Sequence, residues 1–251
     1  MPVLVVAGAL VAALAGTAGA AAGAAPDSGG AAPHFGRGDA VFGVAAVAAI
    51  GLVSTRDLRF TRQAHADRSR FALDLAADAR RFGEPAVIAP VLLATDGLAR
   101  LTGHAALGAA TERIALSTAV AGVCTLTLKE LIGRERPDES STSSTVFHPF
   151  SRHDAFPSGH STFAFALASS ISAESRSRWV PAVLYPVAAL TAWSRVRDAR
   201  HWPSDVVAGA AIGGWVGHAT DVRARHGLPH GLLVLVWPRA RGAGASARLA
   251  F

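Results

Sequence analysis

Apolar residues in this chain gather in runs separated by glycine, proline and charged residues. Six runs fall at Ala40–Val53, Ala86–Leu101, Ile114–Leu128, Ser161–Ala173, Trp179–Trp193 and Val206–Val216. Between the first two runs, residues 55–82 mix apolar and charged positions, which is typical of an amphipathic helix. Helix breakers such as Gly133 and Pro203 stand between the runs. The pattern predicts an all-α domain over residues 39–221, a helical bundle of about six helices.

The length of the runs leaves two interpretations of where this bundle lies. A membrane-spanning helix needs about 20 apolar residues, and shorter runs are typical of buried core helices. Asp96 and the pair Glu112-Arg113 interrupt two of the candidate membrane spans, and a charge in lipid is costly. Helices whose ends project beyond the bilayer to build a site would, however, also show shortened apolar runs.

Charges near the ends of the late helices favour the membrane-embedded interpretation. Arg176 and Arg178 lie in one loop, and Arg223 and Arg225 follow the last run. If the loops that carry the polar motifs face outward, both arginine pairs lie in the cytoplasm, as the positive-inside rule expects. We therefore expect a membrane-embedded bundle in the cell envelope with its site on the extracytoplasmic side. A soluble periplasmic or secreted protein is the alternative.

The two ends of the chain differ in composition from the helical region. Residues 1–25 carry no charged side chain and end in small residues, which predicts an export signal, with an uncleaved membrane anchor as the alternative. Residues 26–38 are rich in glycine and alanine and predict a flexible linker. With a cleaved signal and an outward-facing site, the run at 40–53 has to be a periplasmic or interfacial helix. Residues 222–251 form a tail whose β-prone stretches can pair as a short hairpin.

Composition narrows the class of protein. Hydrophobic residues make up 51% of the chain, and the mean hydropathy of +0.32 lies above that of an ordinary soluble domain. The net charge of +6 suits an anionic membrane surface or an anionic substrate. No lysine- and arginine-rich block indicates nucleic-acid binding. The single cysteine, Cys124, rules out a disulfide framework or a cysteine metal cluster within this sequence.

The first polar motif contains the only lysine, Lys129, in a chain with 23 arginines. Lys129 falls on the last turn of the third run's helix, with Gly133 as the expected C-cap and Pro137 as the stop. Arg136 follows seven residues later. We expect Lys129 and Arg136 to converge on one anion, the guanidinium as a planar fork and the ammonium as a point charge. Alternatively, both cations only complement the helix dipole.

The second motif is Pro157-Ser158-Gly159-His160 at the start of the next helix. Ser158 is a good N-cap, and Gly159 lets an anion approach the backbone. The free N–H groups of a helix N-terminus favour a phosphate there. His160 would then lie close enough to donate a proton to a phosphate oxygen.

The third motif is Ser194-Arg195, followed by His201 and Asp205. His201 and Asp205 are four residues apart and can share a helix face. If Asp205 accepts one ring N–H of His201, the other ring nitrogen is available as a nucleophile. Arg195 supplies a third cation. An exposed His/Asp pair of little energetic value is the alternative.

Together the motifs provide three fixed cations, two histidines and a carboxylate, a set that can break a phosphate ester without a metal or another cofactor. Phosphoryl transfer needs mainly positioning and neutralisation of charge. In the expected sequence, His201 attacks phosphorus, His160 protonates the leaving oxygen, and water then hydrolyses the phosphohistidine.

The three motifs resemble the signature of the type 2 phosphatidic acid phosphatase / vanadium-dependent haloperoxidase superfamily, K-x6-RP, PSGH and SR-x5-H-x3-D, across residues 129–205. The resemblance implies an α-helical bundle. It also implies that phosphate is bound by Lys129, Arg136, Ser158, Gly159 and Arg195. In the same family pattern, His160 is the acid, His201 the nucleophile and Asp205 its orienting partner.

Many bacterial members of this family are membrane proteins that act on lipid phosphates. The resemblance therefore implies a phosphatase for a phospholipid or an isoprenoid phosphate. Two alternatives stay open: a soluble exported acid phosphatase for small phosphomonoesters, and a vanadium-dependent haloperoxidase. His148 and His153 precede the second motif, and we expect them to be solvated loop residues near the mouth of the site, with substrate contact as the alternative; no residue is expected to bind a metal.

Overall fold

The computed structural model describes residues 37–66, 69–140, 142–175, 177–225, 233–239 and 242–248. The predicted export signal at residues 1–25 and nearly all of the predicted linker at 26–38 lie outside the described residues. In the described part, the helices are α2 (Arg37–Ser54), α3 (Asp57–Ala66), α4 (Arg70–Ala79), the 3-10 helix η2 (Arg80–Gly83), α5 (Pro85–Leu101), α6 (Ala105–Ile132), α7 (Gly159–Glu174), α8 (Trp179–Arg197) and α9 (Pro203–Arg225). The predicted all-α domain is confirmed, with eight α-helices described rather than about six.

The main departure from the expected helices is the stretch 55–82, which is broken into α3, α4 and η2. Ser69 begins α4 as an N-cap, since its hydroxyl accepts a hydrogen bond from the backbone N–H of Ala72 at 3.2 Å. A serine that satisfies a free N–H at a helix start favours a break at this point over one continuous helix.

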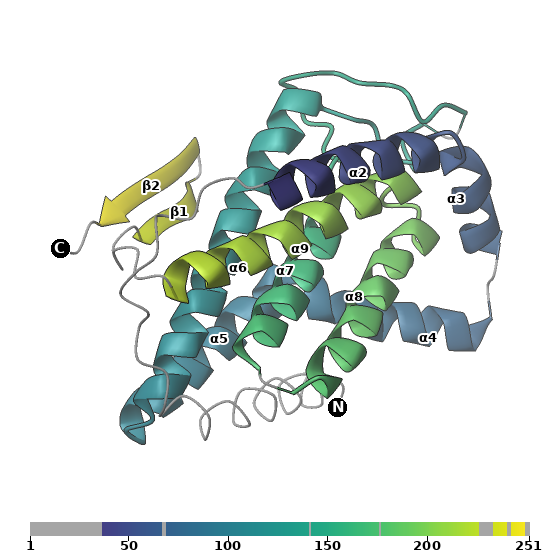
Figure 1. Cartoon of the computed structure of the whole chain (residues 1–251). Helices are drawn as coiled ribbons and strands as arrows, with labels where there is room; N and C mark the ends of the chain where they lie inside the picture. The colour runs from purple at the N-terminus through teal and green to yellow at the C-terminus, as the bar shows by residue number, and fades with distance from the viewer. Residues whose placement is uncertain are drawn as a thin grey trace.

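Helix α7 lies at the centre of the bundle and is surrounded by α6, α8 and α9 (Figure 1). Its buried residues Leu167 and Ile171 pack with Ile114 of α6 and Leu184 of α8 in the main hydrophobic core. The apolar side chains that point inward from α7 thus fix three neighbouring helices around it.

Three glycines of α9, Gly209, Gly213 and Gly217, allow α9 to lie directly against α7. A Cβ atom on Gly209 would stand 2.5 Å from the carbonyl oxygen of Ser158, and one on Gly213 would stand 2.2 Å from that of Thr162. Small residues at intervals of four let helix backbones approach closely, a common feature of packing between membrane helices. The start of α9 is thereby held beside the start of α7, where two of the polar motifs lie.

The outer faces of several helices are apolar and exposed. Val44 of α2 is 72% exposed, Leu93 of α5 is 73% exposed, and Leu126 of α6 is 59% exposed. By length and composition, α2 and α6 can each cross a membrane, and α4 with α5 can form a third span bent by 53° at η2. These features indicate a membrane protein. The composition of α2 suits a span, which weighs against the periplasmic or interfacial helix expected at 40–53.

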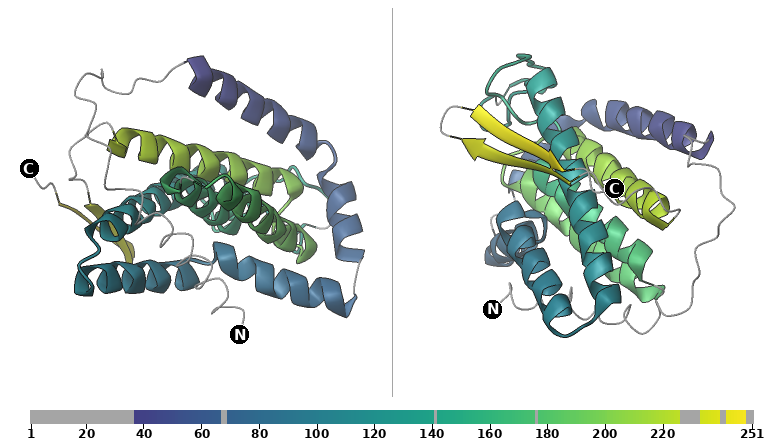
Figure 2. Two further views of the ribbon diagram at one scale, coloured as in Figure 1. Left: turned by 60° about the horizontal axis from the view of Figure 1, so that its bottom comes forward. Right: turned by 90° about the vertical axis from the view of Figure 1, so that its left-hand side faces the viewer.

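The C-terminal tail contains the predicted hairpin. Strands β1 (Leu233–Arg239) and β2 (Gly242–Arg248) pair antiparallel, with Leu233 opposite Arg248 and Trp237 opposite Gly244. Figure 2 shows the hairpin beside the outer side of α6, away from the centre of the bundle.

Candidate active site

Four helix ends bring the three motifs together at one end of the bundle. Lys129 lies in the last turn of α6, and Arg195 lies in the last turn of α8. His160 is in the first turn of α7, and Asp205 is in the first turn of α9. Since α6 and α8 end where α7 and α9 begin, the packing of the bundle places residues up to 76 positions apart in one site.

The predicted cap of α6 has the expected geometry and directs the first motif into this site. Gly133 has a φ of 56°, and its N–H donates to the carbonyl of Lys129 at 2.9 Å. Glycine adopts this left-handed conformation readily, and it ends the helix as a C-cap. The chain turns here, so that Arg136 comes back toward Lys129.

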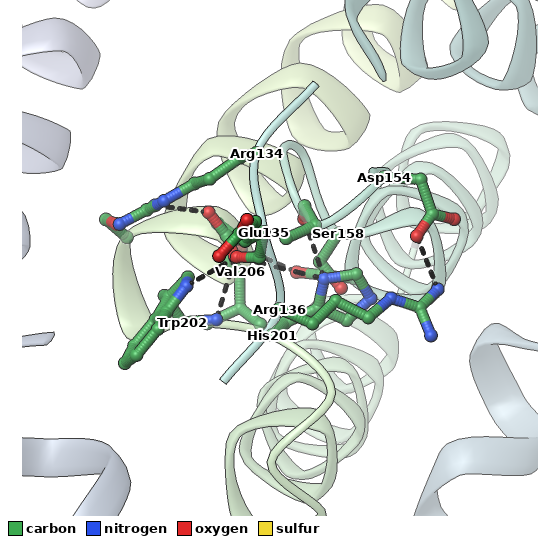
Figure 3. A network of polar contacts seen from close by, with 12 residues as sticks. Arg134, Glu135, Arg136, Asp154, Ser158, His201, Trp202 and Val206 are labelled. Carbon is green, nitrogen blue, oxygen red and sulfur yellow. Dashed lines mark hydrogen bonds and ion pairs between the residues drawn. The ribbon is translucent and has the colours of Figure 1, made fainter. Parts of the chain in front are cut away.

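Asp154 links the two cations of the first motif. Its carboxylate lies 2.7 Å from Arg136 Nη2 and 3.5 Å from Lys129 Nζ, and Lys129 also donates to its backbone carbonyl. The Asp154 side chain is 42% exposed and stands on the open side of the site (Figure 3). Lys129 and Arg136 do converge on one anion, and that anion is a carboxylate of the chain itself.

Three atoms of the expected phosphate-binding residues are buried without a hydrogen-bond partner among the described residues. They are Arg136 Nε, Arg195 Nε and Ser158 Oγ. Buried polar groups in proteins nearly always have a partner, and each exception calls for an explanation. Phosphate oxygens would accept hydrogen bonds from all three groups, so the pattern fits an anion site built from these residues.

Ser158 is the N-cap residue of α7 by its backbone conformation, but its hydroxyl makes no capping hydrogen bond. Its backbone N–H donates to the carbonyl of Asp205 at 3.0 Å, which ties the starts of α7 and α9 together. The hydroxyl has no hydrogen-bond partner among the described residues, so it remains available to a ligand at the α7 N-terminus.

His160 lies on the more accessible side of the site and is partly buried. Burial, together with the positive charges of Arg195, Arg80, Lys129 and Arg136, lowers its pKa to about 4. The ring is thus neutral at pH 7 without a bound anion. A phosphate dianion would offset the surrounding positive charge and raise this pKa, because an opposite charge favours the protonated ring.

His201 is almost completely buried, and the backbone rather than a carboxylate fixes its tautomer. Its Nδ1 lies 2.7 Å from the carbonyl oxygen of Ala155. A carbonyl oxygen only accepts, so Nδ1 carries the proton and Nε2 carries the lone pair. Burial and the charges of Lys129 and Arg195 lower the pKa of His201 well below its ordinary value. The ring is neutral at pH 7, as a nitrogen nucleophile has to be.

Asp205 does not accept the ring N–H of His201, in contrast to the expectation from their spacing. Its nearer oxygen is 4.0 Å from His201 Nδ1, and it accepts the backbone N–H of Trp202 at 2.8 Å instead. The other oxygen lies 2.5 Å from Arg134 Nη1. Burial raises the pKa of Asp205 to about 7, although Arg134 acts in the opposite direction. Asp205 therefore positions His201 through the turn at Trp202, and not through the ring.

Comparison with known proteins agrees with the geometry of these motifs. Residues 112–222 match the model of the PAP2 superfamily, a segment that contains every expected site residue. The segment that carries all three motifs is therefore similar to the PAP2 superfamily. The resemblance seen in the three motifs is thus confirmed.

Curated relatives of the chain are named as phosphatases. Over 105 residues the chain is 40% identical to lipid A 1-phosphatase from Porphyromonas gingivalis, covering 41% of this chain and 21% of the relative. It is 39% identical over 127 residues to lipid A 1-phosphatase from Rhizobium etli, covering 45% and 50%. It is 35% identical over 102 residues to decaprenylphosphoryl-5-phosphoribose phosphatase from Mycobacterium tuberculosis, covering 41% and 54%. The alignments thus span about half or less of the length of these relatives.

A solved structure shows the same fold. The transmembrane PAP2 type phosphatidylglycerolphosphate phosphatase from Bacillus subtilis matches with a TM-score of 0.57 at 20% identity. The match covers 72% of this chain and 92% of that one. The helical bundle is therefore the fold of a transmembrane PAP2 protein.

Arg134 is a further residue of the site, and its role was not predicted from the sequence. It lies between Lys129 and Arg136 and is 3% exposed. Its guanidinium donates to Asp205 of α9 and to Asp57 of α3, the latter at 2.7 Å. It also donates to the hydroxyl of Ser204 at 2.8 Å, and Asp57 accepts from the same hydroxyl at 2.6 Å. In Figure 3, Arg134 lies on the opposite side of His201 from Arg136.

The Arg134 network holds the loop that carries His201. Asp57 also accepts the backbone N–H of Ser204 at 2.9 Å, and Trp202 Nε1 donates to the carbonyl of Glu135 at 2.9 Å. A buried arginine shared by two carboxylates is strongly held, because removing any partner leaves a buried charge unpaired. Residue type gave no signal for this role, since Arg134 is one of 23 arginines and Asp57 lies 77 residues away.

Proposed function

We propose that this protein is a metal-independent phosphatase that hydrolyses a phosphate monoester or diphosphate carried by a lipid. The observation that carries the proposal is the set of buried donors without partners around His201, contributed by Arg136, Arg195 and Ser158. With Lys129 and the α7 N-terminus, these donors can neutralise the equatorial oxygens of a phosphoryl group in transfer.

In the proposed reaction, Nε2 of His201 attacks phosphorus and forms an N–P bond while the bond to the leaving oxygen breaks. His160 transfers its ring proton to that oxygen, so the alcohol leaves neutral. Water then attacks phosphorus as His160 takes its proton, and the N–P bond breaks to release inorganic phosphate. The hydrogen bond from His201 Nδ1 to Ala155 keeps Nε2 directed at the phosphorus throughout.

A groove beside the site supports a lipid substrate. It has a volume of about 370 Å³ and lies between α5, α6 and α7. Its wall is largely apolar: Pro85, Ile88, Ala89, Leu92, Leu93, Asp96, Thr111, Glu112, Ala115, Thr118, Ala119 and Phe163. The groove begins near the site, since Gly83 packs against the backbone of His160 and Phe163 lies one turn further along α7. An acyl or isoprenoid chain in this groove would leave its phosphate near His160. Relatives named lipid A 1-phosphatase and decaprenylphosphoryl-5-phosphoribose phosphatase likewise support a lipid substrate.

The distribution of charge supports a site on the extracytoplasmic side of the membrane. Arg178 precedes α8, whereas Arg195 lies at the other end of the same helix, in the site. If the end with Arg178 faces the cytoplasm, as the positive-inside rule expects, the catalytic end faces outward.

The test is phosphate release by the purified full chain in detergent with excess EDTA. Phosphatidic acid, an isoprenoid diphosphate and a water-soluble phosphomonoester are compared for wild type and His201→Ala. We expect turnover of a lipid substrate that persists in EDTA and falls by about 10² to 10⁴ in the variant. A ³²P-labelled lipid should label wild type at an acid-labile position, whereas His201→Ala should stay unlabelled.

Several outcomes would contradict the proposal. Loss of turnover in EDTA would rule out metal independence, and full activity in His201→Ala would rule out the phosphohistidine. Preference for the soluble phosphomonoester would indicate an acid phosphatase. Bromination of a dye with vanadate and peroxide, without phosphate release, would indicate a haloperoxidase.

A further inference from the structure

The loop between α6 and α7 carries a second cluster of polar side chains, outside the proposed reaction. Glu135, His148 and His153 each offer one ligand atom, and these atoms all lie within 4.8 Å of one another. The rings of the two histidines have their centroids 5.0 Å apart. From the sequence alone, both histidines are expected to be solvated loop residues near the mouth of the site.

Backbone hydrogen bonds hold this cluster in place. Arg134 and Phe147 form a β-bridge, so that Glu135 and His148 stand on two paired extended segments. The backbone N–H of His148 donates to the carbonyl of Gly133 at 2.7 Å, and that of Glu135 donates to Val146 at 3.2 Å. Two of the three side chains are therefore positioned by the backbone, as a built site requires.

The donor set fits a divalent metal of the zinc type. Two imidazoles and one carboxylate are common ligands for zinc, with metal–ligand distances of about 2.0–2.2 Å. A tetrahedral ion at these distances separates neighbouring ligand atoms by about 3.3 Å. His148 Nε2 and Glu135 Oε1 are already 3.0 Å apart. All three ligand atoms lie within 4.8 Å of one another, so a closer approach of the His153 ring would complete a set of three ligands, with water as the fourth.

Glu139 supplies the outer support that such a site needs. Its carboxylate lies 3.0 Å from His153 Nδ1, so the ring can donate from Nδ1 and present Nε2 to the ion. A histidine that ligates a metal usually donates its other N–H to a carboxylate or a carbonyl. The same oxygen of Glu139 accepts the backbone N–H of Arg136 at 3.0 Å, which fixes Glu139.

We propose that Glu135, His148 and His153 bind one zinc-type divalent cation at the rim of the candidate active site, supported by Glu139. The ion takes no part in phosphoryl transfer. The ion links the two paired segments of the loop between α6 and α7. It lies next to Arg136 and Asp154, two residues that contact the site. Arg136 follows Glu135, and Asp154 follows His153 and bonds Lys129 and Arg136.

The two histidine–glutamate pairs alone would be a weaker explanation of this arrangement. Exposed ion pairs contribute little to stability, and ion pairing does not require the two pairs to lie next to each other. Here the ligand atoms of Glu135, His148 and His153 converge, and Glu139 also bonds the ring of His153.

The experiment measures Zn²⁺ binding to the full chain without a histidine tag, stripped with chelator and purified in detergent. Zn²⁺ is titrated against a competing chromophoric chelator for wild type, His148→Ala, Glu139→Gln and the control His104→Ala. His104 is another exposed histidine, at the start of α6, where its ring bonds Thr102. We expect one Zn²⁺ per chain in wild type and in the control. We expect at least 100-fold weaker binding in His148→Ala, and 10- to 100-fold weaker binding in Glu139→Gln.

Co²⁺ substitution provides a second readout, because tetrahedral Co²⁺ absorbs far more strongly in the visible range than hydrated Co²⁺. The band should appear in wild type and in His104→Ala and be absent from His148→Ala. Equal Zn²⁺ binding by His148→Ala and His104→Ala would overturn the proposal, as would a wild type that binds no Zn²⁺. Phosphatase activity enters neither measurement, so the result is independent of the proposed reaction.

Discussion

At the scale of single residues, the site is defined by which groups already have partners. Lys129 and Arg136 share the carboxylate of Asp154, and His201 is held by the carbonyl of Ala155. The Nε atoms of Arg136 and Arg195 have no partner among the described residues. A phosphate that enters this site has to replace the Asp154 carboxylate at Lys129 and Arg136. It can then accept hydrogen bonds from the unpartnered Nε atoms of the two arginines.

Asp154→Asn tests whether this carboxylate competes with phosphate. The substitution removes a negative charge while keeping the shape of the side chain, so we expect tighter inhibition by inorganic phosphate, by about 2- to 10-fold. This range reflects a partly exposed ion pair. The inhibition constant is measured for Asp154→Asn and for Asp138→Asn, which removes an exposed carboxylate paired with Arg200 outside the cation set. Weaker inhibition in Asp154→Asn would show that Asp154 organises Lys129 and Arg136 instead of competing for them.

His160 should titrate differently with and without bound substrate. Its pKa of about 4 in the free site is low because of burial and four nearby cations. Bound phosphate raises this pKa, and the ring has to be protonated to act as an acid. Activity is therefore lost as pH rises through the pKa of His160. The basic limb of kcat, which reports the complex, should lie at higher pH than that of kcat/KM, which reports the free enzyme.

The pH profiles are measured for wild type and for His160→Gln. The variant should lose the basic limb together with most of its activity. Coincident limbs in wild type, or an unchanged limb in the variant, would assign the acid to another group.

At the scale of helices, the contact between α7 and α9 sets the relative positions of the site residues at the starts of these two helices. Gly209, Gly213 and Gly217 bring α9 against α7, and Ser161 Oγ donates to the carbonyl of Val206 at 2.7 Å. Any change in the spacing of these helices would also move His160 relative to His201.

Gly213→Ala and Gly214→Ala form a matched pair that tests this contact. A Cβ on Gly213 would meet the Thr162 carbonyl at 2.2 Å, whereas Gly214 has no neighbouring atom within 4 Å of its added Cβ. We expect Gly213→Ala to lower the free energy of unfolding by about 1–3 kcal/mol through overpacking. Gly214→Ala should be neutral or stabilising by up to about 1 kcal/mol, because alanine favours a helix. Thermal unfolding in detergent checks both, and equal stability of the two variants would contradict the close packing.

The helix pattern predicted most elements, and its errors have physical causes. Helix α6 begins at Ala105, whereas the apolar run predicted a start at Ile114. The charged residues Glu112 and Arg113 do not interrupt the helix, because both are paired. Arg113 bonds Glu174 of α7, and Glu112 bonds Arg100 of α5. Pairing across helices depends on packing, which the periodicity of one segment does not contain.

The same reason limits what could be predicted about the site. Lys129, Arg136 and His160 stand out by residue type and local spacing, and the structure brings them together. The hydrogen bond of His201 goes to a backbone carbonyl, which leaves no trace in residue type. The partnership of Arg134 with Asp57 depends on the burial of both side chains. Sequence therefore predicted the groups proposed to touch phosphate better than those that position them.

At the scale of the whole molecule, an apolar exterior surrounds a polar site at one end. Val44, Leu93 and Leu126 are exposed on three different helices, and α2 and α6 have the length and composition of spans. Such a surface is unfavourable in water and suits a lipid environment.

Membrane fractionation tests this arrangement. We expect the full chain to stay in the membrane pellet after an alkaline carbonate wash and to enter solution only with detergent, because lipid covers the exposed apolar faces. A known peripheral protein in the same preparation serves as the control for release. Release of the chain by carbonate would indicate a soluble envelope protein and would remove the main support for a lipid substrate.

The ion pair between Arg134 and Asp57 also bears on how this protein can be re-engineered. Asp57 lies in α3, outside the segment 112–222 that defines the superfamily. A chimera that placed only this segment in a relative would transplant Arg134 and Asp205 without Asp57, the second carboxylate that pairs with Arg134. Grafts intended to change specificity should therefore carry α3 with the motif-bearing helices, or introduce a matching acid at position 57.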